Sequence, residues 1–139
     1  MNNHAHPWTD HDYKIDIHPP YLKGGYLIQQ PEKIPEGTEV SIVVTGNVTI
    51  YVALQGPRWV ERGGYEISLP RDGWEMKNGK ISPNWGLDMR DWDLTTIYSK
   101  DYRTNKKRTI LLPPTTTTAS YMIITVVPIC SGNIKAIIW

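Results

Sequence analysis

Residues 38–54 constrain the fold of this chain more than any other segment. Two runs rich in β-branched residues, 38–45 and 48–54, flank the pair Gly46-Asn47. Such a pair readily adopts the positive φ angles of a tight two-residue turn. Apolar residues recur at every second position in both runs, so an extended chain would collect them on one face. We therefore expect a two-stranded hairpin whose apolar face packs against another sheet.

The same pattern predicts strands along the rest of the chain. Further extended segments are expected at 26–28, 65–69, 94–102, 108–112 and 134–139. Asn78-Gly79 predicts a second hairpin. Residues 121–127 form an almost continuous apolar run, which is typical of a central strand covered on both faces. No segment shows a convincing helical period, so the expected fold is an all-β, antiparallel two-sheet β-sandwich of the jelly-roll kind.

The length of the chain suits one domain. A chain of 139 residues can bury roughly two thirds of its unfolded surface, and no internal boundary is marked. Residues 1–20 are polar and irregular, and they end in His18-Pro19-Pro20, which disfavours a helix. We expect an extended N-terminal arm over 1–20 and a single sandwich domain over 21–139.

Charge and cysteine content exclude several classes of function. The net charge is +1, which gives no field to attract nucleic acid or an anionic membrane. The basic run at 103–108 is expected to be a solvated hairpin loop. No stretch has the about 18 apolar residues of a membrane span. Cys130 is the only cysteine and every histidine lies within the first 18 residues, so neither a disulfide nor a Cys-His nucleophile is expected.

The N-terminal segment holds the densest cluster of metal-ligand residue types. In an extended chain His4 and His6 lie on the same side, at a spacing that suits a divalent metal, and His11 follows between Asp10 and Asp12. A solvated polar arm is the expected explanation of these residues. A bound metal, including one that serves a metal-dependent enzyme, stays open as the alternative.

Residues 83–93 show neither strand nor helix period and are expected to form a long loop. The loop carries three carboxylates, Asp88, Asp91 and Asp93, beside Arg90. They could pair with the guanidinium, hold a structural calcium ion or act as the two carboxylates of a glycosidase. Their spacing is diagnostic of none of these sites. No serine triad or phosphate-binding loop occurs, so we expect a protein that is not an enzyme.

Aromatic residues give the better indication of function. The chain has 6 Trp and 8 Tyr but no Phe, and aromatic rings with a polar atom favour partly solvated positions. An exposed indole can pack against the C–H face of a sugar ring while neighbouring polar groups bind its hydroxyls. The candidate ligand-binding residues are Trp74, Trp85, Asp88, Arg90, Asp91 and Trp92. The same residues would also suit a protein-binding hot spot or simple packing of the core.

Four short motifs resemble those of a known class of module. They are Tyr51-Val52-Ala53, Arg58-Trp59-Val60, Tyr98-Ser99-Lys100 and the apolar run 121–127. Over about residues 38–128 the chain resembles the β-sandwich accessory modules of secreted polysaccharide-degrading enzymes and other extracellular proteins. Leu54-Gln55 departs from the acidic residue expected after the first motif. The resemblance implies a non-catalytic, extracellular module.

Two functional expectations follow. The first is non-catalytic binding of carbohydrate or glycoprotein, with Trp85 and Trp92 as the platform and calcium as the only cofactor considered. The second is a structural or protein-interaction domain that pairs through its sheet edges or terminal arm with another protein or a second copy.

Overall fold

A five-stranded antiparallel sheet forms the centre of the molecule. The computed structural model describes residues 5–10, 13–56, 61–85, 92–103 and 106–129. The strand order is β2 (Tyr26–Ile28), β11 (Ile123–Pro128), β5 (Val48–Gln55), β8 (Leu94–Tyr102) and β6 (Glu75–Lys77). Three two-stranded sheets pair β1 (Ile15–Ile17) with β7 (Ser82–Pro83), β3 (Lys33–Ile34) with β10 (Ala119–Ser120), and β4 (Ser41–Thr45) with β9 (Lys107–Leu111). The 3-10 turn η1 spans Pro20–Leu22, and the helix α1 spans Tyr65–Arg71.

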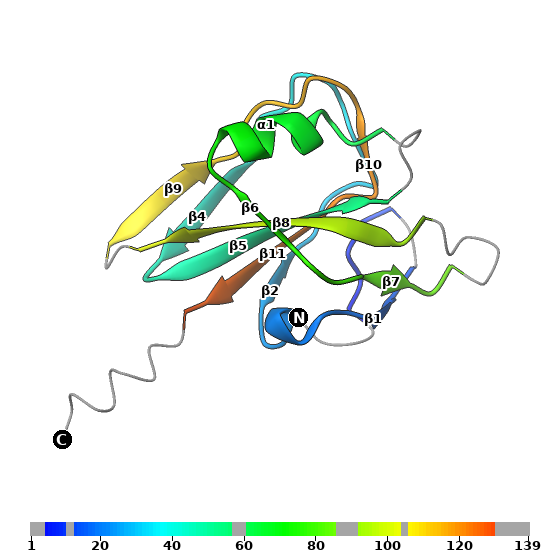
Figure 1. Cartoon of the computed structure of the whole chain (residues 1–139), viewed down its shortest axis with the longest axis horizontal. Coiled ribbons are helices and arrows are strands. Elements are labelled where there is room, and N and C mark those ends of the chain that lie inside the picture. Colours follow the sequence, from blue (N-terminus) through cyan, green and yellow to red (C-terminus); the bar gives the residue numbers. More distant parts are fainter. Residues whose placement is uncertain (1–4, 11–12, 57–60, 86–91, 104–105, 130–139) are drawn as a thin grey trace.

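Both faces of the central sheet are covered, as Figure 1 shows. The β4–β9 sheet and α1 lie over one face, where Val48, Ile50 and Val52 meet Ile42 and Ile110 in the larger core. The segment that holds β1, η1 and β7 lies under the other face in a second core. The expectation of an all-β antiparallel sandwich is confirmed. The apolar run of β11 is also explained, because this strand lies between β2 and β5 with cores on both sides.

The predicted hairpin at 38–54 is wrong in its pairing. The two runs do form strands, but β4 pairs with β9 and β5 pairs with β8 and β11. The chain at Gly46, which has a φ of 86°, therefore crosses from one sheet to the other. The predicted apolar face of each run is confirmed, because Ile42, Val44, Val48 and Ile50 all face the space between the sheets. An apolar face on each run is equally satisfied by packing the two strands face to face.

A helix replaces the strand expected at 65–69. Tyr65 and Leu69 are completely buried, and their i, i+4 spacing puts them on one face of α1, whereas Ile67 is 55% exposed. The helix starts after Gly63 and Gly64, both of which have a positive φ that suits glycine. The alternation Tyr-x-Ile-x-Leu resembled a strand because the middle apolar residue is a surface one.

Two further turn predictions are corrected. The strands on either side of Asn78-Gly79 do not pair with each other, because β6 joins β8 at the edge of the central sheet and β7 joins β1. The basic run is not a hairpin loop either, since β8 and β9 belong to different sheets. Its described residues Arg103, Lys106, Lys107 and Arg108 are exposed, as expected for a solvated segment.

The described residues of the N-terminal segment pack against the sheet. Trp8 is 1% exposed and Ile15 is completely buried in the second core. Strand β1 pairs with β7, and the indole N–H of Trp8 donates to the carbonyl of Met122 at 3.0 Å. The described residues 5–10 and 13–20 therefore contribute to the core, and the boundary between segment 1–20 and the rest of the chain stays a prediction.

Some expectations lie outside the described residues. They concern Cys130, the strand expected at 134–139 and the motif Arg58-Trp59-Val60. Within the described part of the chain, the helices are too short to span a membrane.

Candidate functional site

The three tryptophans expected to bind a ligand lie inside the protein or at its margin. Trp74 is 5% exposed in the larger core, and Trp85 is 8% exposed in the second core. The ring of Trp85 stacks on Trp8 with centroids 6.1 Å apart, and its N–H donates to the buried Asp93 at 3.2 Å. The covered ring of Trp85 does not favour the platform role predicted for it, nor does the burial of Trp74 favour ligand contact; both roles stay predictions. Trp92 is half-buried, and its role stays a prediction.

The remaining predicted ligands are not brought together by the described structure. Asp88, Arg90 and Asp91 lie outside the described residues, as do His4 and His11. Within the ranges that are described, no three His, Cys, Asp or Glu side chains gather in a way that could hold a metal ion. His6 is exposed, and its backbone carbonyl accepts a hydrogen bond from the side chain of Gln29. The metal and calcium hypotheses stay predictions.

A polar groove lies on the central sheet where the second core ends. Three strands build it, because Tyr51 of β5 is in register with Ser99 of β8, which is in register with Glu75 of β6. Two residues further along the same pair of strands, Thr49 is in register with Asp101. The groove encloses about 360 Å³, a volume within the range of small-ligand sites. It is lined by Thr49, Tyr51, Gly73, Glu75, Lys77, Ser99, Lys100 and Asp101.

Period-two alternation places Thr49, Tyr51, Ser99 and Asp101 on one face of the sheet, whereas Lys100, in register with Ile50, leaves from the other face at the edge of the groove. Along β5, Val48, Ile50 and Val52 face the larger core, so Thr49 and Tyr51 face the opposite side. The N-terminal layer covers that side beneath Ala53 and Ile97, whereas the groove lies over the polar ends of the strands. The sheet thus presents an apolar half to the second core and a polar half to the groove.

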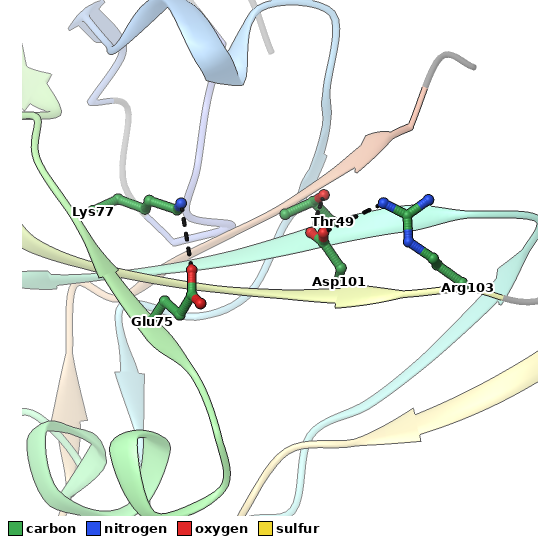
Figure 2. Close-up of polar contacts among 5 residues, drawn as sticks. All are labelled: Thr49, Glu75, Lys77, Asp101 and Arg103. Carbon is green, nitrogen blue, oxygen red and sulfur yellow. Dashed lines mark hydrogen bonds and ion pairs between the residues drawn. The ribbon is translucent and has the colours of Figure 1, made fainter. Parts of the chain in front are cut away.

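Figure 2 shows Thr49 with four charged side chains of the groove and its rim. The hydroxyl of Thr49 donates to Asp101 Oδ1 at 2.7 Å, and Asp101 Oδ2 lies 3.8 Å from an amino group of Arg103. Glu75 lies 3.7 Å from Lys77 on the same strand. The side chains of both carboxylates remain exposed, Asp101 by 55% and Glu75 by 79%. Exposed pairs of this kind are weak, so a ligand can compete for these groups.

The groove offers balanced charge and alternating hydrogen-bond donors and acceptors. Its lining includes two acidic residues, Glu75 and Asp101, and two basic residues, Lys77 and Lys100. Lys100 donates to the backbone carbonyl of Asp72 at 2.7 Å and lies 3.7 Å from the Asp72 carboxylate, so its ammonium is already paired at the rim. Carboxylates accept hydrogen bonds and ammonium groups donate them, while the hydroxyls do both. This chemistry suits a ligand that carries several hydroxyl groups and no net charge.

Tyr51 supplies the aromatic wall of the groove. Its ring stacks on that of Tyr21 with centroids 5.0 Å apart and an interplanar angle of 26°. Burial, and then the negative charge of Asp101, raise the pKa of the Tyr51 phenol. The phenol therefore keeps its proton in neutral solution and is available as a hydrogen-bond donor.

The buried phenols predict a loss of stability in alkaline solution. Burial raises the pKa of Tyr21 and of Tyr65 from 10.0 to about 12. A raised folded-state pKa means that these groups stabilise the fold fully below pH 10 and lose that contribution as the pH rises towards about 12. Urea unfolding is expected to show a constant midpoint below pH 10 and a falling one above it. Tyrosinate absorbance of the folded protein that rises with an ordinary pKa of 10.0 for all tyrosines would contradict this.

Sequence reasoning missed the groove. Its signal was present in Thr49 and Tyr51, the two polar positions that alternate with the apolar face of one strand. The pairing of β5 with β8 joins segments about 50 residues apart, and that of β8 with β6 joins segments about 25 residues apart. No local pattern shows which strands are neighbours.

Comparisons with known proteins show what the fold is similar to. No protein-family model matches the chain, and none of the curated proteins matches its sequence. Among solved structures, the fold is similar to part of a β-glucuronidase from glycoside hydrolase family 2, with a TM-score of 0.65 and 13% sequence identity. The match covers 93% of this chain and 13% of the enzyme. The chain thus shares a β-sandwich fold with a small part of a much larger carbohydrate-active protein.

Proposed function

We propose that this protein is a non-catalytic β-sandwich module that binds carbohydrate in the polar groove of its central sheet. The observation that carries the proposal is the row of hydrogen-bonding side chains on three adjacent strands, beside the ring of Tyr51. A rigid sheet holds these groups at fixed spacing, and an aromatic wall can pack against the C–H face of a sugar. The fold likeness to part of a β-glucuronidase supports a place among the modules of carbohydrate-active proteins.

The groove favours a neutral sugar over a charged one. Glu75 and Asp101 would repel the carboxylate or sulfate of an acidic sugar, whereas Lys77 and Lys100 would repel an amino sugar in its charged form. The hydroxyls of a neutral sugar can hydrogen-bond to both the acidic and the basic residues without electrostatic repulsion. An open groove of this kind supports millimolar to micromolar affinity, because it offsets the cost of association with few contacts.

The surroundings of the Glu75 and Asp101 carboxylates fit binding without catalysis. Each is exposed and lies near a cation, Glu75 near Lys77 and Asp101 near Arg103. Neither carboxylate lies in the enclosed, apolar surroundings typical of the general acid of a glycosidase. We propose an extracellular location for the same module, in keeping with a role on polysaccharide or glycoprotein surfaces.

A panel of neutral and acidic oligosaccharides tests this proposal. The wild-type protein is expected to bind neutral oligosaccharides and to bind their uronate or sulfated counterparts more weakly. Tyr51→Ala, which removes the aromatic wall, is expected to raise Kd more than about tenfold. Tyr26→Ala is the matched control, since Tyr26 is 68% exposed and does not line the groove. A folded wild-type protein that binds nothing on the panel would refute carbohydrate binding.

Self-association through β4 is the second candidate function. In the described part of the chain β4 pairs with β9 alone, and its outward side chains Ser41, Val43 and Thr45 carry no charge. Edge strands are normally protected from pairing by charges, which this strand lacks. An apolar groove of about 230 Å³, lined partly by Tyr26 and Val43, lies beside it. We propose that β4 of a second copy pairs antiparallel with this edge.

Sedimentation at increasing concentration tests the second candidate. The wild-type protein is expected to form a dimer, and Val43→Lys is expected to keep the protein monomeric because it adds a charge to the pairing edge. Ile67→Lys is the matched control, since Ile67 is equally exposed at 55% but lies on α1. A monomer at all concentrations would exclude this function.

A further inference from the structure

The turn η1 joins the two walls of the polar groove through one side chain. Tyr21 stacks on Tyr51, which forms the wall on β5. The hydroxyl of Tyr21 also donates to the backbone carbonyl of Asn78 at 2.9 Å. Asn78 directly follows Lys77, the last residue of β6 and part of the opposite wall. Tyr21 thus connects strands that lie on either side of β8.

The contact between η1 and the end of β6 is close. A Cβ added at Gly79 would lie 2.6 Å from Pro19 Cγ and 2.7 Å from the Tyr21 hydroxyl oxygen. Only glycine allows the backbone to approach the η1 segment this closely. The backbone of Gly79 therefore contacts the side chains of Pro19 and Tyr21 just after β6 ends.

Strand β6 needs such support. It has three residues, and the described structure pairs it on one side only, with β8. Glu75 and Met76 on this strand are exposed, so little apolar burial holds it in place. Short edge strands with exposed backbone are among the first elements to open locally.

We propose that Tyr21 is a positioning residue of the groove: it fixes the Tyr51 ring and the Lys77-bearing edge strand at the spacing that a ligand requires. This inference rests on the proposed carbohydrate site, although its structural half can be tested without a ligand. Tyr21 does not line the groove, so it acts through the two walls that it connects.

Three variants separate the two contacts of Tyr21. Tyr21→Phe keeps the ring stack and loses the hydrogen bond to Asn78, Tyr21→Ala loses both, and Gly79→Ala displaces the η1 segment by steric contact. Amide hydrogen exchange of 75–77 is measured for each folded variant. Exchange is expected to accelerate at least about tenfold in Tyr21→Ala and Gly79→Ala, and less in Tyr21→Phe. Ile67→Ala, at a side chain that is 55% exposed on α1, is the control and is expected to leave the exchange of 75–77 unchanged.

The affinity for the neutral oligosaccharide bound best by the wild-type protein is the second readout. Kd is expected to rise about tenfold or more in Tyr21→Ala, with partial recovery in Tyr21→Phe. A loss of global stability alone would change neither the Kd nor the local hydrogen exchange of residues 75–77 as long as the protein stays folded. Unchanged exchange in Tyr21→Ala overturns the inference whether or not a ligand binds. Accelerated exchange with unchanged Kd overturns its positioning role, and a wild-type protein without glycan binding refutes only the proposed function.

Discussion

Trp8→Ala is expected to lower the free energy of unfolding by about 3–5 kcal/mol, the typical cost of removing a buried Trp. Trp8 is 1% exposed and stacks on Trp85, while the ring of Tyr121 meets it edge-on at 4.9 Å. Its N–H donates to the carbonyl of Met122, directly before the central strand β11. Replacing the indole leaves a cavity in the second core and removes one of two hydrogen bonds to the Met122 carbonyl, which the side chain of Gln30 still reaches at 2.7 Å. The cavity therefore accounts for most of the expected loss.

Urea unfolding followed by circular dichroism measures this effect without depending on tryptophan fluorescence. Trp8→Phe fills much of the cavity and loses the hydrogen bond, so it is expected to cost less than Trp8→Ala. Met76→Ala, at a side chain that is 66% exposed, is expected to stay within about 0.5 kcal/mol of the wild type. A Trp8→Ala protein as stable as the wild type would mean that the N-terminal segment is a dispensable arm in solution.

The strand positions were predictable because they depend on local periodicity. Strands at 26–28 and 94–102 were predicted within their observed bounds, and the apolar run of β11 indicated a strand with two covered faces. The pairing was not predictable in the same way. Gly46-Asn47 favours any reversal of the chain, and the alternation of both runs fits a hairpin and a crossing between sheets equally well.

The candidate site was harder to predict for a physical reason. Tryptophan was expected on the surface because its indole N–H favours partial solvation, but buried acceptors satisfy this group here. The Met122 carbonyl accepts from Trp8 and the carboxylate of Asp93 accepts from Trp85. The groove combines side chains from three strands, each of which looks like the ordinary solvent face of a strand when read alone.

Asp101→Ala is expected to weaken binding of a neutral oligosaccharide about tenfold to a hundredfold. The carboxylate of Asp101 is the acceptor that fixes the Thr49 hydroxyl at 2.7 Å, so its loss affects two groups of the groove at once. A hydrogen bond to a charged group contributes about 1.5–3 kcal/mol, which corresponds to that change in Kd. Asp101→Asn keeps one acceptor oxygen and is expected to fall between Asp101→Ala and the wild type.

Stability provides the control for this measurement. Asp101 and Arg103 are both more than half exposed, so breaking their ion pair is expected to change the free energy of unfolding by less than about 1 kcal/mol. A large loss of affinity without a loss of stability would therefore show that the substitution acts on the binding site itself. Asp16→Ala removes an exposed carboxylate on β1, away from the groove, and is expected to leave Kd unchanged. If Asp101→Ala and Asp16→Ala bound the oligosaccharide equally well, the ligand would have to lie elsewhere, and the polar groove would be only the solvated face of a structural sheet.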